Sequence, residues 1–348
     1  MINAVRLVWG SLDRIIMCMS HNERMLNGPG GLDFSRVKGN LVFRYVTSLL
    51  WKTHLRRFSC TVVDDDRNSD DFNLQYSDNH SDFIKWNVYS TILTRHLSFV
   101  PDFDMFSSTP DSRWPACHAL LRALGPGPTL LSDLPGTPSN IAIIDRLSAK
   151  IQSGEIKVVK MRQPATVPSV RWFWDNIQGA GDGPGLVASS RAPEAAGALI
   201  AVWNIRKAEG GGMVRDRIGI EEVNDAIDGN LAADHVLWKV GLSGPSLFSV
   251  ITLEWSGLEI QLDRAGCELF VSAKIWDIGG TRVSILGMLS KYAPLAGLRV
   301  SEDRGEFGQI TSVSLLMVRD PPCRDEIRSR RLSLGMGGYR AGACICQR

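Results

Sequence analysis

The sequence contains no run of about 18 uninterrupted apolar residues, the length that a helix needs to cross a bilayer. Its charge is nearly balanced, because 39 basic and 37 acidic side chains leave a net charge of +2 at pH 7. The first absence argues against a membrane protein, and the second argues against nucleic acid or a charged membrane surface as partner. Near the start, Asp13 and Arg14 interrupt the apolar residues and no small-residue cleavage site follows, which is unlike a secretory signal.

The cysteines also lack a recognisable pattern. There are seven, and only Cys344 and Cys346 lie close together, so neither a CxxC pair nor a His/Cys spacing typical of zinc is present. An odd number of cysteines without a secretory signal favours a reducing compartment. We therefore expect a cytoplasmic protein that binds no metal and uses no cofactor.

What the sequence does contain suits a globular protein of one or two domains, since 44% of the 348 residues are hydrophobic and 22% are charged. Short strand-like runs at 15–19, 60–63 and 129–131, with another just before residue 101, alternate with helical periodicity at 83–100, 114–124 and 141–151. Acidic residues at 64–66 interrupt the second of these runs. The alternation predicts parallel βα units. Four such strands make half of an eight-stranded barrel, which we assign to residues 1–160.

The pattern changes at about residue 161, where helical periodicity fades. Residues 178–185 are rich in glycine, and short apolar segments follow at 198–204, 235–240, 247–254, 257–262, 267–275 and 282–288. Turn residues separate these segments, which predicts an antiparallel β domain over residues 161–320. Residues 321–348 are rich in proline, arginine and glycine, and we expect a disordered tail there.

Three stretches place carboxylates where an apolar or aromatic run gives way to polar residues, proline or glycine. They are Arg67-Asn68-Ser69-Asp70-Asp71-Phe72, Pro101-Asp102-Phe103-Asp104-Met105-Phe106 and Ser132-Asp133-Leu134-Pro135-Gly136. In an α/β barrel, groups at the carboxyl ends of successive strands converge on one mouth. Paired carboxylates beside aromatics are what glycoside hydrolysis requires. The alternative is that these aspartates cap turns, where aspartate is common.

These stretches belong to an ordered set that resembles one known family. The set runs Cys18-Met19-Ser20-His21-Asn22, Arg67 to Phe72, Pro101 to Phe106, and Gly127-Pro128 with Ser132-Asp133 and Pro135-Gly136. In this order the motifs resemble the raffinose synthase and seed-imbibition-protein group of family-36 glycoside hydrolases, which includes alkaline α-galactosidases. A weaker likeness continues at Gly266-Cys267-Glu268-Leu269-Phe270 and Val283-Ser284-Ile285-Leu286-Gly287.

The resemblance implies a fold and an activity. The fold would be the C-terminal half of a TIM-type (β/α)8 barrel followed by the family's antiparallel β domain. The activity would be hydrolysis or transfer of α-galactosyl groups by a retaining mechanism. The implied partner is an α-galactoside or related oligosaccharide.

The resemblance also implies that the strand carrying Arg67 to Phe72 supplies the catalytic acid/base. Because side chains alternate along a strand, Arg67, Ser69 and Asp71 share one face. An arginine beside the acid/base can hold a sugar hydroxyl, so we expect the Arg67 face to line the mouth. This selects Asp71 as the acid/base and leaves Asp70 a supporting role.

The other motifs supply the remaining candidate substrate-binding residues. Asp102 and Asp104 share a face and would accept hydrogen bonds from sugar hydroxyls or from Arg67. Phe103 is a candidate apolar wall or an ordinary core residue. Two further positions leave alternatives open: His21 either contacts substrate or is structural, and Asp133 either lines the mouth or caps a turn.

The sequence departs from the family pattern at several positions. Phe103 stands where the family usually has tryptophan, Phe72-Asn73-Leu74 replaces Phe-Phe-Pro, and Pro126-Gly127-Pro128 replaces Gly-Gly-Pro. These changes alter the shape expected for the sugar subsites. The family's nucleophile lies in a Lys-x-Asp motif on a strand that precedes the Cys18 strand, and this sequence does not contain it. We therefore expect the chain alone to be inert on α-galactosides.

Three functions are consistent with these observations. The first is an enzyme that acts on α-galactosides. The second is a non-catalytic remnant that binds sugar weakly, and the third is an interaction module built on the β-rich second half. An upstream segment carrying the Lys-x-Asp strand would favour the first, and sugar-independent binding by residues 166–320 would favour the third.

Residues 36–60 differ from both flanks, because they contain six lysine and arginine residues and no acid. The family's connection here is much shorter. A basic amphipathic helix for a membrane surface and an extra surface helix are two interpretations. We favour a third, an accidental insertion such as translated intron sequence, because the segment separates two motifs that otherwise lie close.

Deletion of residues 36–60 should leave thermal stability unchanged or improved, because a long connection without a core role contributes little to the folded state. Thermal denaturation of the deleted and full chains provides the comparison. A clear fall in the melting temperature would show that the segment packs into the fold.

Overall fold

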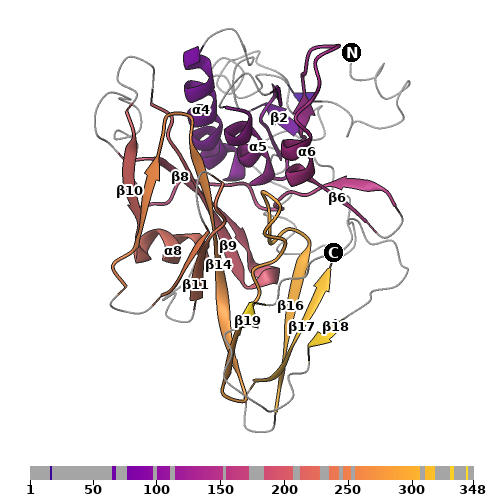
Figure 1. Cartoon of the computed structure of the whole chain (residues 1–348), viewed down its shortest axis with the longest axis vertical. Helices are drawn as coiled ribbons and strands as arrows, with labels where there is room; N and C mark the ends of the chain where they lie inside the picture. The colour runs from indigo at the N-terminus through magenta and orange to yellow at the C-terminus, as the bar shows by residue number, and fades with distance from the viewer. Residues whose placement is uncertain are drawn as a thin grey trace, which may run out of the picture.

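The computed structural model describes residues 16–17, 65–67, 77–96, 100–109, 114–151, 154–171, 184–206, 212–227, 235–242, 246–251, 255–305, 310–317, 330–332 and 342–343. Residues 36–60 lie outside this set. The helices of the first half lie together at one end of the structure, and strands dominate the second half (Figure 1). No helix in these ranges is long and apolar enough to span a membrane.

The first half contains short parallel strands with helices between them. Strands β1 (Ile16–Met17), β2 (Asp65–Arg67) and β3 (Val100–Asp102) form one parallel sheet in that order. Strands β4 (Met105–Phe106) and β5 (Leu130–Leu131) form a second parallel pair. Helix α4 (Ser77–His96) lies between β2 and β3 in the sequence, and α5 (Pro115–Ala123) lies between β4 and β5. The predicted parallel pairing is confirmed, although the described strands do not form a closed barrel.

Some predicted boundaries in this half were wrong. Strand β2 includes Asp65 and Asp66, which were expected to interrupt a strand at 60–63. Backbone pairing with β1 on one side and β3 on the other overrides the low strand propensity of aspartate. Helix α6 (Ile141–Leu147) ends earlier than predicted, because residues 148–150 form strand β6 and pair antiparallel with β7 (Ile156–Val158).

The second half is built on a long antiparallel sheet. Its strands are β8 (Leu186–Ala192), β9 (Gly197–Trp203), β14 (Cys267–Ile278), β11 (His235–Lys239) and β12 (Leu247–Val250), in that spatial order. The far end of β14 pairs with β15 (Thr281–Ser284). The segments predicted at 198–204, 235–240, 267–275 and 282–288 therefore correspond to strands, with limits that differ by a few residues.

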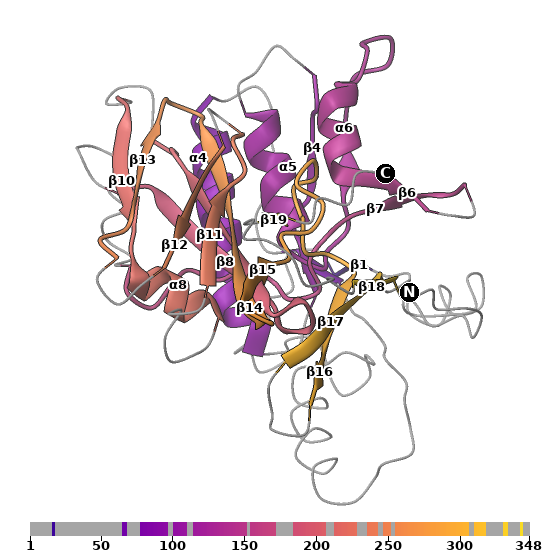
Figure 2. The same ribbon diagram turned by 60° about the horizontal axis from the view of Figure 1, so that its bottom comes forward.

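Strands β9 and β14 are buried on both faces. Along β9, Leu199, Ala201 and Trp203 belong to one hydrophobic cluster, while Ala198, Ile200 and Val202 belong to another. This division follows from the alternation of side chains along a strand. Strands β10 (Val214–Ile218) and β13 (Leu258–Leu262), with helix α8 (Ile220–Ile227), contribute to the second cluster. Figure 2 shows these elements on one side of the central sheet and α5 on the other.

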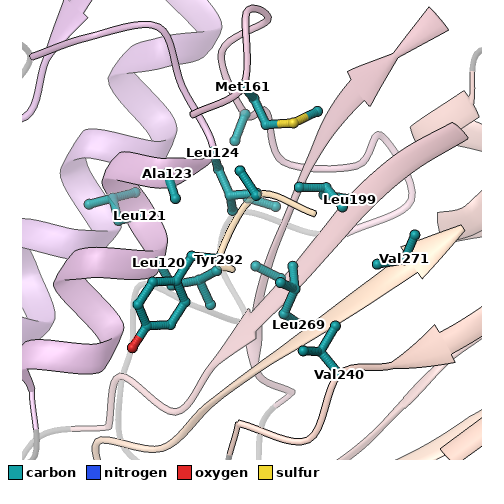
Figure 3. Packing of buried hydrophobic residues seen from close by; sticks show 14 of the residues in the cluster. Leu120, Leu121, Ala123, Leu124, Met161, Leu199, Val240, Leu269, Val271 and Tyr292 are labelled. Carbon is teal, nitrogen blue, oxygen red and sulfur yellow. The ribbon is translucent and has the colours of Figure 1, made fainter. Parts of the chain in front are cut away.

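The first cluster joins the two halves of the chain. Leu120 and Leu124, at and just beyond the end of α5, are fully buried in the same cluster as Leu199 and Leu269 of the central sheet, and Figure 3 shows them on the side of α5 that faces the sheet. The contact also includes polar groups: Trp203 Nε1 donates to the Cys117 carbonyl at 3.2 Å, and Cys117 Sγ donates to the Ala265 carbonyl at 3.2 Å. The central sheet thereby holds α5 in place.

The end of the chain contributes a smaller sheet. Strands β16 (Leu298–Arg304), β17 (Ile310–Met317) and β18 (Arg330–Leu332) pair antiparallel, and β19 (Gly342–Ala343) pairs parallel with β15. Two of these short strands, β18 and β19, fall within residues 321–348, for which disorder is predicted.

Leu269→Ala should lower the free energy of unfolding by about 2–5 kcal/mol, because it leaves a cavity between α5 and the central sheet. Leu134→Ala is the matched control. Its side chain is 69% exposed, so a change within about 0.5 kcal/mol is expected. Chemical denaturation measures both. Equal effects of the two substitutions would contradict the shared core.

Candidate active site

The predicted site residues divide into those that the structure describes and those outside it. His21, Asp70 and Asp71 are outside the described residues, and for Arg67 only the backbone of β2 is described. In the β2–β3 ladder, Arg67 is the Cα partner of Asp102. Two motifs that lie 35 positions apart in the sequence thus meet at the carboxyl ends of neighbouring parallel strands.

Asp102 and Asp104 occupy a tight turn between β3 and β4. Asp102 Oδ1 accepts a hydrogen bond from the Asp104 N–H at 2.9 Å, and Asp104 has a φ of 51°. Left-handed backbone is costly for most residues, and aspartate is among the few that tolerate it. Each side chain is only 1% exposed. The two carboxylates are therefore held in a fixed, buried turn.

Arg122 of α5 organises this turn. Its Nη2 donates to the carbonyl oxygens of Phe103, Asp104 and Met105, and its Nε also donates to the Asp104 carbonyl at 3.1 Å. Burial lowers the pKa of Arg122 to about 9, against the opposing effect of the Asp104 and Asp102 carboxylates. The guanidinium therefore stays positive at neutral pH. Sequence reasoning missed Arg122, although a lone cation in the apolar run Ala119 to Leu124 was a usable signal.

Phe103 and Phe106 lie in the hydrophobic interior. They are 2% and 0% exposed and belong to the cluster that joins α5 to the central sheet. The guanidinium of Arg122 lies over the Phe106 ring, 4.6 Å from its centroid, a favourable cation–π arrangement. Phe106 is thus a core residue, and a sugar contact by Phe103 stays a prediction.

A buried histidine pair lies next to Arg122. His80 Nδ1 and His118 Nε2 are 2.9 Å apart, and the His80 ring stacks on Trp114 with centroids separated by 5.4 Å. Burial lowers the pKa of His80 to about 4. Burial, followed by the charges of Arg122 and His80, lowers the pKa of His118 as well. Both rings are therefore neutral at pH 7.

Asp133 connects the ends of β4 and β5. Its carboxylate accepts hydrogen bonds from Ser107 Oγ at 2.9 Å and from the Ser108 N–H and Oγ, each at 2.6 Å. Burial by itself raises the pKa of Asp133, but hydrogen bonds from Ser108, Ser139 and Ser107 together outweigh it and bring the pKa to about 2. Asp133 is therefore ionised and stabilises the loops at this edge.

Gly127, from the family-like Gly127-Pro128 motif, packs against β3. A Cβ atom on Gly127 would lie 1.9 Å from the Pro101 carbonyl oxygen, so no larger residue fits without movement of the strand. Lys160 Nζ donates to the carbonyls of Pro126 and Gly127 at 2.6 and 2.7 Å. This glycine thus keeps the loop close to the turn that carries Asp102 and Asp104, the carboxylate turn.

The geometry supports carboxylate and hydrogen-bond chemistry at this edge. Among the described residues, no group of three or more histidine, cysteine, aspartate or glutamate side chains is arranged to hold a metal ion. The polar groups gathered here are carboxylate oxygens, serine hydroxyls and a guanidinium, and the Asp102, Asp104 and Arg122 side chains among them are buried.

Comparison with known proteins gives weak likenesses. No protein-family model matches the chain, and no curated protein matches it either. An α-galactosidase from Saccharomyces cerevisiae (MEL1) superposes with a TM-score of 0.40 and 11% identity, over 60% of this chain and 59% of that protein. An α-galactosidase from the same organism, solved with raffinose, gives a TM-score of 0.33 and 12% identity over 54% and 50% of the two chains. The chain thus spans less than two thirds of either enzyme, and similarity at this level assigns no residue a role.

Stability should fall as the pH drops from about 6.5 toward 4, because the unfolded chain protonates histidines that the fold keeps neutral. A folded pKa near 4 for His80 corresponds to a loss of about 1–2 kcal/mol between pH 7 and pH 5. Chemical denaturation at a series of pH values measures it. His80→Gln should flatten the slope over this interval, and an unchanged slope would contradict the assignment.

Proposed function

We propose that the chain is a carbohydrate-active protein of the α-galactosidase and raffinose synthase type. Its substrate would bind at the carboxyl ends of β2, β3, β4 and β5. The observation that carries this proposal is the register of β2 and β3, which pairs Arg67 with Asp102. These two residues belong to two of the family-like motifs, and barrel enzymes assemble their sites from side chains at the carboxyl ends of neighbouring parallel strands.

In the retaining mechanism, one carboxylate attacks the anomeric carbon and a second protonates the leaving oxygen. Asp71 takes the acid/base role. It lies four positions after Arg67, the residue that pairs with Asp102 in the β2–β3 ladder. A general acid at neutral pH needs a raised pKa, which a partly apolar site supplies. Asp70, His21, Phe103 and Asp133 serve as supporting or substrate-binding groups.

A specific observation favours a second candidate function, sugar binding without turnover. Asp102 and Asp104 are 1% exposed, and one already accepts a backbone hydrogen bond from the other. Buried carboxylates that stabilise their own turn reach a sugar only if the neighbouring chain moves. A module with this arrangement would recognise an α-galactoside weakly and would have no catalytic cycle.

Calorimetric titration with methyl α-galactoside tests recognition. The chain should bind this sugar and should bind methyl α-glucoside far more weakly. Asp102→Asn keeps an acceptor for the Asp104 N–H but removes the charge, and it should weaken binding about tenfold or more, as expected for loss of one charged hydrogen bond. Asp277→Asn is the control, because Asp277 caps the remote β14–β15 turn through the Gly280 N–H.

Turnover then separates the two candidates. Because the chain lacks the family's Lys-x-Asp motif, turnover is measured after a family N-terminal half that supplies the nucleophile has been joined to it. Cleavage of aryl α-galactosides by this completed protein, abolished by Asp71→Asn for poor leaving groups while the first step is spared for good ones, supports the enzyme. Binding without cleavage supports the sugar-binding module. Failure of the unaltered chain to bind methyl α-galactoside contradicts both.

A further inference from the structure

Arg122 is unusual in where its hydrogen bonds go. Its side chain is 1% exposed, and the hydrogen bonds that it donates reach main-chain oxygens. Those of Phe103, Asp104 and Met105 belong to the carboxylate turn, and that of His118 belongs to α5 itself, 3.0 Å from Nη1. A buried cation is expensive unless it is fully satisfied. Most of the hydrogen bonds that the Arg122 guanidinium donates are accepted by carbonyl oxygens of one four-residue turn, 102–105.

This contact determines the shape of the turn. Three consecutive carbonyls can point at one guanidinium only if the backbone between them curls back, and Asp104 adopts its left-handed φ of 51° at that point. The same curl directs the Asp104 N–H at Asp102 Oδ1. The backbone that carries both aspartates, and the hydrogen bond that holds the Asp102 carboxylate, therefore depend on a side chain from another element.

Charge reinforces this dependence. The Asp104 and Asp102 carboxylates both lie near enough to Arg122 to favour its protonated form. Two carboxylates without a nearby cation would repel each other in a buried turn. One guanidinium between the turn and α5 both neutralises part of this charge and supplies the donors.

We propose that Arg122 is a positioning residue that presents the Asp102–Asp104 turn for α-galactoside recognition. This inference rests on the proposed function. Lysine is a poor substitute, because an ammonium group lacks the planar fork with which arginine reaches several oxygens at once. Packing of Leu120 and Leu124 against the central sheet fixes α5, and α5 in turn fixes the guanidinium.

Arg122→Lys provides the test, with Arg206→Lys as the matched control. Arg206 is also buried, at 7% exposure, and donates to a main-chain carbonyl, that of Met213, in the second half of the chain. Titration with methyl α-galactoside, thermal denaturation and amide hydrogen exchange over residues 100–109 are measured on each full chain. Arg122→Gln, which keeps a donor without charge, serves as the second variant at the same position.

Arg122→Lys should weaken methyl α-galactoside binding at least tenfold and should raise exchange over residues 100–109. Arg206→Lys should leave binding and that exchange unchanged at a similar cost in melting temperature. Arg122→Gln should show the same local rise in exchange.

Three outcomes would overturn the inference. The first is wild-type affinity in Arg122→Lys, and the second is an equal loss of affinity in Arg206→Lys. The third is unchanged exchange over residues 100–109 in both Arg122 variants. Absence of binding by the unaltered chain is a different result, since it removes the proposed function and with it the role in recognition, while the exchange data still report on whether Arg122 holds the turn.

Discussion

The β9–β14 pair is the constraint on which the described fold depends. A strand covered on both faces must carry apolar side chains at nearly every position, and all seven residues of β9 are buried. Each face of this pair then needs its own covering layer. Strands β10 and β13 with α8 cover one face, and α5 with its neighbours covers the other. The two halves of the chain are therefore joined through one shared core.

Helix α5 connects this core to the carboxylate turn, because it packs in the core and also carries Arg122. One side of the helix packs leucines on the central sheet, whereas Arg122 and His118 meet the segment that connects β3 to β4. Polar groups this deep are tolerated because each finds partners: the guanidinium binds carbonyl oxygens, and the two histidines contact each other. A helix buried on almost all sides thus serves as both core and scaffold.

The functional proposal joins two kinds of support. The ordered motifs resemble one family of glycoside hydrolases, and the β2–β3 register brings two of those motifs together at the end of a parallel sheet. The likeness to yeast α-galactosidases is too weak to carry the argument. Asp102 and Asp104 are buried, and this limits how a sugar could be recognised. A sugar reaches their carboxylates only if the chain next to the turn moves, and otherwise it must be bound by groups of the neighbouring segments.

Periodicity and turn residues in the sequence determined most of the element types. The helices near 114–124 and 141–151 and the strands near 198–204 and 267–275 follow from patterns that neighbouring residues set locally. Strands β8, β16 and β17 were missed. The polar alternation of Leu298 to Arg304 gives a weak signal, and it is a strand because β17 pairs with it. Pairing is a long-range property that local pattern does not contain.

The tertiary structure alone decided where the described candidate site residues lie and how deeply they are buried. The sequence predicted that Asp102, Phe103 and Asp104 lie near Arg67, but it could not show that they are buried, since burial depends on which distant element covers them. It likewise could not reveal that Arg122 would bind three carbonyls of one turn or that His80 would meet His118. Side chains 17 to 38 positions apart become neighbours only when α4 and α5 pack beside β4, and that packing is set by the core they share.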